Sequence, residues 1–153
     1  MKNSLFVALA LLLFSCQKNV YKKLDTDFNE NRWEKTDVRN FEFSVADNNS
    51  NYDLILLFSH GYDFGLSEIP VRIEIRNSDN TVSTEDLIVK ISDTSGKRFG
   101  DCSGDYCDLK QAVFENRKLA AGNYKVAVIN EFDHSFLPNV LGVGIELNLS
   151  KSN

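Results

Sequence analysis

The sequence predicts an all-β protein, folded as an antiparallel β-sandwich of the jelly-roll or immunoglobulin-like kind. Three observations support this fold class. Apolar and polar residues alternate with a period of two over much of the chain after residue 32, which is typical of strands with one buried face. Short polar turns separate these stretches, and no helical apolar period of comparable length lies between them. The 11 Phe and 5 Tyr residues supply β-forming aromatic side chains for a core.

Each predicted strand follows from its own pattern. Phe41, Phe43 and Val45 alternate with polar neighbours, and further period-two stretches occur at 71–75, 87–91, 124–128 and 143–149. Residues 54–58 are apolar at every position, so this strand should lie centrally and be covered on both faces. Turn-forming residues occupy the intervals between strands, at 47–51, 77–80, 92–96 and 121–123.

Length and charge narrow the class of function. A chain of 153 residues fits one domain. The 17 Lys and Arg against 22 Asp and Glu give a net charge of -5, so we expect no nucleic-acid partner, because such partners require a broad cationic surface. Only two His and one Met are available for metal or redox chemistry, and we expect no metal and no cofactor. This composition favours a structural or recognition module over an enzyme.

The first residues have the order of an export signal. Lys2 precedes an apolar run at 5–14, which is shorter than the roughly 20 residues that a transmembrane helix needs. Ser15 and Cys16 follow and resemble a bacterial lipobox, in which the Cys thiol receives diacylglycerol before cleavage. We therefore predict a lipid on Cys16 and a protein that is tethered to a membrane. The alternative is a plain secretory signal with a chance Cys at its end.

The predicted organisation has four parts. Residues 1–15 form the cleaved lipoprotein signal peptide, and 16–31 form a lipidated tether whose later half docks on the domain. Residues 32–149 form the β-sandwich, and 150–153 form a C-terminal tail.

Two cysteines remain after lipidation. Cys102 and Cys107 flank a Ser-Gly-Asp-Tyr turn, and in an exported protein this spacing favours a local disulfide. Zinc is the less favoured alternative, because it would need two more ligands than the pair supplies. The neighbouring Asp residues also suggest a cation-binding loop, but they lack the spacing of a calcium loop and indicate a solvated acidic turn.

The remaining candidates for function lie in two segments, at 59–65 and 131–138. Each holds one His, an Asp and aromatic residues. A hydrolytic triad would need a nucleophile setting that the sequence does not show, so we interpret His60 and His134 as backbone-bonded loop residues and expect no enzyme activity. Exposed loop aromatics more often serve recognition. We predict partner binding through these segments, with five candidate residues: His60, Tyr62, Phe64, Phe136 and Leu137.

Several short motifs follow one another along the chain: Trp33-Glu34-Lys35, Phe41-Glu42-Phe43, Phe58-Ser59-His60, Gly100-Asp101, Asp105-Tyr106 and the run from Leu137 through Pro138 to Gly144. In this order they resemble the motifs of the GldH-type gliding-motility lipoproteins of the Bacteroidota. Together with the lipobox, they span nearly the whole chain. The cysteine pair departs from the pattern of this family and is interpreted as a local variation.

This resemblance implies a lipoprotein of the cell envelope, placed on the outer membrane, that works with the gliding machinery and its associated protein-secretion apparatus. It supplies no catalytic residues. It implies a structural or assembly component that contacts other envelope or gliding-machinery proteins. The alternative is a surface β-sandwich that binds a glycan or another ligand, and a flat exposed platform of Tyr62, Phe64 and Phe136 would favour that alternative.

Overall fold

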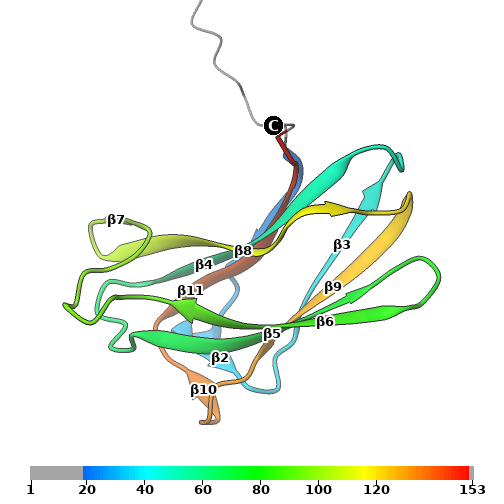
Figure 1. Ribbon diagram of the computed structural model, residues 1–153. Coiled ribbons are helices and arrows are strands. Elements are labelled where there is room, and N and C mark those ends of the chain that lie inside the picture. The colour runs from blue at the N-terminus through cyan, green and yellow to red at the C-terminus, as the bar shows by residue number, and fades with distance from the viewer. Residues whose placement is uncertain (1–18, 152–153) are drawn as a thin grey trace, which may run out of the picture.

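The computed structural model describes residues 19–151, which form two antiparallel β-sheets packed face to face (Figure 1). The predicted signal peptide and Cys16 lie outside the described residues. The predicted all-β sandwich is confirmed. The one helical segment among the described residues is a 3-10 turn at Asn29–Asn31.

Two sheets and a small ribbon contain all the named strands. The larger sheet has the order β1 (Asn19–Asp25), β11 (Val140–Leu149), β4 (Asn51–Gly61), β8 (Tyr106–Lys118) and β7 (Asp101–Ser103). The second sheet has the order β3 (Arg39–Val45), β9 (Gly122–Asn130), β5 (Glu68–Arg76) and β6 (Val82–Lys90). The ribbon pairs β2 (Trp33–Glu34) with β10 (Phe136–Leu137).

The strand order is that of a jelly roll. Along the chain, the long strands alternate between the two sheets, apart from the hairpin of β5 and β6. The order β1-β11-β4-β8 faces the order β3-β9-β5-β6, which is the double Greek key that defines this fold. The sequence left the jelly-roll and immunoglobulin-like arrangements open, and the strand order decides between them.

The core forms where the period-two faces of both sheets meet. Phe41, Phe43 and Val45 are buried while their neighbours are exposed, and the ring of Phe43 stacks on Tyr124 with centroids 5.2 Å apart. Strand β4 lies between β11 and β8, as its apolar run predicted, and both Phe58 and Leu57, on opposite faces, are buried.

The domain extends into the segment that the sequence assigned to a tether. Strand β1 pairs with β11 from Asn19 to Asp25, well before residue 32. Glycine makes this pairing possible, because a Cβ at Gly144 would lie 2.7 Å from Cα of Leu24 and closer still to the carbonyl oxygen of Lys23. The sequence did not predict strand β1, because its side chains are largely polar or charged and do not alternate with apolar residues that could form a buried face.

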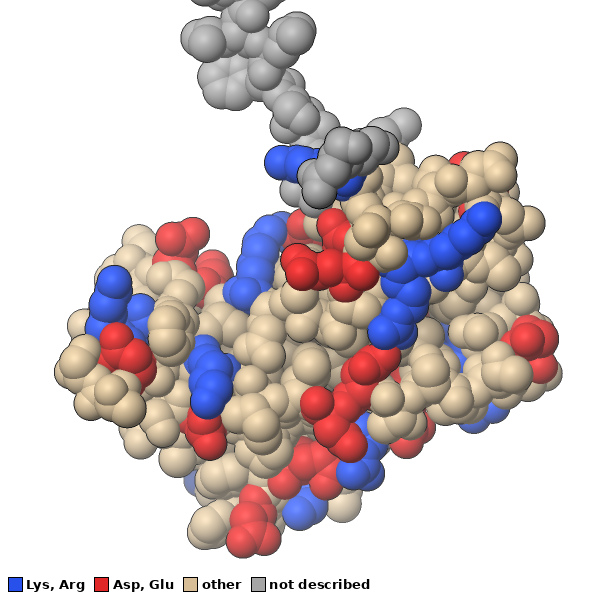
Figure 2. Space-filling model, viewed as in Figure 1, with Lys and Arg blue, Asp and Glu red and all other residues tan. Residues whose placement is uncertain are grey.

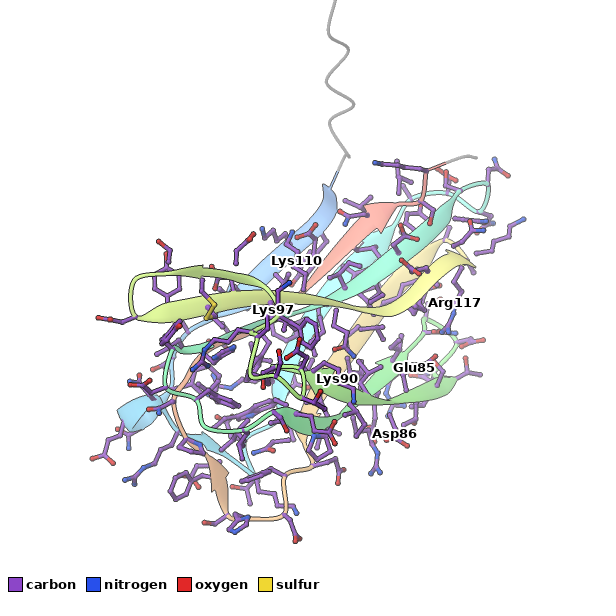
Figure 3. All side chains as sticks on the ribbon, turned by 60° about the vertical axis from the view of Figure 1, so that its left-hand side comes forward. Glu85, Asp86, Lys90, Lys97, Lys110 and Arg117 are labelled. Carbon is purple, nitrogen blue, oxygen red and sulfur yellow. A yellow bond between two sulfur atoms is a disulfide. The ribbon has the colours of Figure 1, made fainter. Side chains whose placement is uncertain are left out.

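Polar side chains connect β8 of the larger sheet with β6 of the second sheet. Arg117 on β8 pairs with Glu85 on β6 at 2.8 Å, and Figure 3 shows both residues. Gln111 Nε2 donates to the carbonyl oxygen of Ile88 at 3.1 Å, so part of the β6 edge has a partner within the molecule.

Candidate functional site

The two loop segments singled out in the sequence meet at one end of the sandwich. The backbone N–H of Gly61 donates to the carbonyl oxygen of Asn139 at 2.9 Å. In return, Asn139 Nδ2 donates to the carbonyl oxygen of Asp63 at 3.4 Å. In Figure 1 this is the end that carries β10, away from the start of β1. Segments about 75 residues apart are therefore joined into one surface.

Between these segments lies an open groove of about 340 Å³, which we call the distal groove. Its lining is largely aromatic and aliphatic and consists of Phe64, Gly65, Leu66, Phe132, His134, Ser135, Phe136 and Pro138. The rings of Phe132 and His134 stack with centroids 5.0 Å apart. A groove of this size and composition can take apolar side chains of a partner.

The β2–β10 ribbon fixes one wall of the distal groove. Leu137 lies opposite Trp33 in the register, and Asn130 Nδ2 donates to the carbonyl oxygen of Trp33 at 2.9 Å inside the protein. Lys35 N donates to the carbonyl oxygen of Ser135 at 2.8 Å. The wall is thus held by hydrogen bonds to backbone carbonyl groups, one of which is buried, and this arrangement limits its reorganisation on binding.

Two of the predicted partner-binding residues are accessible. Phe136 is half-buried in the groove, with the guanidinium of Arg32 4.7 Å from its ring centroid. Tyr62 is 47% exposed and lies under Arg98 at 4.1 Å, but it does not line the groove.

The expectation that Phe64 and Leu137 are exposed is corrected, and His60 is buried as well. The exposed fractions are 3% for Phe64 and 0% for both Leu137 and His60. His60 and Phe58 lie on the inward face of β4, and the His60 ring packs 4.8 Å from that of Phe64. Leu137 belongs to the buried core together with Trp33, which lies opposite it in the ribbon. These side chains support the groove from beneath, and Tyr62, Phe64 and Phe136 do not form a shared exposed platform.

His60 is a structural residue of this cluster. Its Nδ1–H donates to the carbonyl oxygen of Gly61 at 2.8 Å, so the backbone-bonded interpretation is confirmed, although the residue lies in a strand. Nε2 is buried and has no hydrogen-bond partner among the described residues. Burial lowers the pKa of the His60 imidazole, so the ring is neutral at pH 7.

Sequence reasoning missed part of the lining. Leu66 and Pro138 were not singled out as binding residues, although Leu66 directly follows the 59–65 segment and Pro138 ends the 131–138 segment. Their role depends on how two distant loops meet, and no local pattern carries that information.

A disulfide joins Cys102 and Cys107, directly across β7 and β8, with their Cα atoms 4.0 Å apart. Its sulfur atoms bond to each other and are therefore not thiolate ligands. The adjacent Asp108 accepts a hydrogen bond from Ser59 Oγ. In residues 19–151 no group of three or more His, Cys, Asp or Glu side chains is arranged to hold a metal ion.

Charges of both signs are interspersed on the visible face of the molecule, and Figure 2 shows no broad cationic area there. Residues 19–151 contain no helix that is long and apolar enough to cross a bilayer.

The protein is a jelly-roll sandwich with an open, largely apolar groove at one end. A family model described as GldH lipoprotein matches residues 19–147, from the start of β1 into β11. The chain therefore belongs to the GldH lipoprotein family, a family of gliding-motility lipoproteins.

A curated relative agrees with this membership. It is the gliding motility lipoprotein GldH homolog of Christiangramia forsetii, 27% identical over 126 residues. The aligned region covers 81% of this chain and 76% of that protein. The family description names a lipoprotein and no enzymatic activity.

Proposed function

We propose that this lipoprotein is a non-catalytic assembly component of the gliding machinery and its associated secretion apparatus. It is anchored to the outer membrane through a lipid on Cys16 and binds another envelope protein through the distal groove. The observation that carries the proposal is the groove itself, whose apolar lining is accessible at the end of the sandwich away from β1.

The chemistry of the groove favours a protein partner. Accessible aromatic residues beside charged ones are typical of the anchor points in protein interfaces, and Phe136 beside Arg32 has this character. The buried hydrogen bond from Asn130 to the β2–β10 ribbon holds the wall in place before a partner arrives. A glycan would more often stack on a flat exposed aromatic platform, and burial of Phe64 argues against the one that the sequence suggested.

A photoreactive phenylalanine analogue at position 136 tests this proposal. In cells that express the full chain, illumination should crosslink it to one discrete envelope protein, because residue 136 lines the groove. The matched control places the same analogue at Ile88, which is 48% exposed on β6 and lies outside the groove. Equal crosslinking from both positions, or none from 136, would contradict the proposal.

A further inference from the structure

The start of β1 limits how far the domain can lie from its membrane. Asn19 begins the strand, three residues after Cys16. A fully extended chain spans at most about 3.6 Å per residue, so the Cα atoms of these two residues are within about 11 Å of each other. A lipid on Cys16 therefore keeps this end of the sandwich at the level of the lipid headgroups.

Ion pairs also join strand β1 to the rest of the larger sheet. Lys22 on β1 and Lys110 on β8 both pair with Glu146, at 3.5 and 2.9 Å. Burial raises the pKa of the Glu146 carboxyl, but hydrogen bonds from Asn148 and Lys110 outweigh this effect and hold the pKa below its usual value. Glu146 is therefore ionised at pH 7 and pairs with both lysines, so ion pairs link β1 across β11 to β8.

A polar hollow lies at this same end of the sandwich. It has a volume of about 510 Å³, and we call it the proximal hollow. Its lining is mostly amide, hydroxyl and one ammonium group, from Asn49, Ser50, Asn51, Asn116, Leu149, Ser150 and Lys151. The first residue of β1 pairs with Asn148, and Ser150 N donates to the carbonyl oxygen of Asn51 at 2.9 Å, so the hollow adjoins the anchor strand.

We propose that the proximal hollow contacts the phosphate-bearing headgroups of the anchoring membrane and turns the distal groove away from it. This inference rests on the lipid anchor proposed above. The amide of Asn51 already donates to Asn116 Oδ1 at 2.8 Å, and the hydroxyl of Ser150 donates to Asp53. The amide groups of Asn49 and Asn116 and the ammonium of Lys151 are donors that suit phosphate oxygens. Individually weak contacts suffice, because a tether of even about a dozen flexible residues keeps the hollow and the headgroups at an effective concentration of about millimolar.

The orientation sets the height of the groove. Strand β11 runs from Val140, beside the groove loop, to Leu149 in the hollow, and has ten residues. At about 3.4 Å per residue this is about 30 Å. The partner is therefore met at most about 30 Å beyond the hollow.

Energy transfer in reconstituted vesicles tests the orientation. Full-length lipidated protein, with a fluorescent residue at Asn49 or at Ser135, is placed in vesicles of phosphatidylethanolamine and phosphatidylglycerol that carry a headgroup acceptor. Transfer should be strong from position 49 in the hollow and weak from position 135 in the groove. Equal transfer from both positions would overturn the proposal.

Two variants separate headgroup contact from the short link alone. A flexible Gly/Ser insertion of about ten residues after Lys18 should preserve the difference between the two labels, because the hollow still binds. Combining this insertion with Asn116→Asp and Lys151→Glu should abolish the difference, whereas combining it with Thr94→Asp and Lys97→Glu in the exposed β6–β7 loop should not. Loss of the difference in the insertion variant alone would overturn headgroup contact. The mass of the purified protein shows whether it carries the lipid. If it carries none and does not associate with vesicles, the proposed lipid anchor is wrong, and headgroup contact is not the cause.

Discussion

Replacing Ile73 with Asp is expected to leave no soluble folded domain. Ile73 is 0% exposed in β5, between Val128 of β9 and Glu85 of β6. A carboxylate there would enter the core without a cationic partner, and the cost of several kcal/mol is comparable to the whole stability of about 5–15 kcal/mol of a domain this size. Circular dichroism of the soluble fraction and the yield after expression measure the effect.

The matched control is Ser83→Asp on the neighbouring strand, where the side chain is exposed. This variant should fold like the natural protein. A soluble Ile73→Asp variant with the natural unfolding midpoint would show that the inward face of β5 is not part of the core.

Replacing Cys16 with Ser is expected to abolish membrane anchoring. Serine has no thiol to accept diacylglycerol, so the precursor should stay unprocessed and incorporate no labelled fatty acid. Each buried methylene of an acyl chain contributes about 0.8 kcal/mol to membrane binding, so losing the chains removes stable anchoring. Fatty-acid labelling and fractionation of the cell envelope measure both effects.

The control for this experiment replaces Cys102 and Cys107 with Ser. These residues form the disulfide of the β7–β8 hairpin, and their loss should leave lipid incorporation unchanged. Fatty acid on the Cys16→Ser variant would contradict the lipobox assignment.

The strands of the sandwich could be predicted because burial on one face requires a period of two. Phe41, Phe43 and Val45 show that period in the sequence and are buried in the structure. Strand β1 lacks a comparable apolar face, and its place at the edge of the sheet depends on close approach to Gly144, a contact between the two ends of the chain. A strand that forms through a tertiary pairing of this kind has no local sequence pattern that predicts it.

The candidate site could be predicted only in part, for the same reason. The loops that meet at the groove were identified, because they place aromatics beside turn residues. The direction of each side chain was not predictable, because His60 belongs to the inward face of a strand that extends past the apolar run, and Leu137 is buried opposite Trp33, which is more than 100 residues away. Burial of these side chains is a property of the assembled fold.

The most direct test of the account is recovery of an envelope partner by the lipidated Phe136→Ala variant. Crosslinked pulldown from the envelope should lose the partner, while the midpoint of thermal unfolding stays close to that of the natural protein, because this half-buried ring lines the groove. Tyr106→Ala, which removes an aromatic ring that is 44% exposed outside the groove, should keep the partner. Undiminished recovery with Phe136→Ala, or a fall in the unfolding midpoint as large as a buried aromatic truncation gives, would contradict the claim that the distal groove binds a protein.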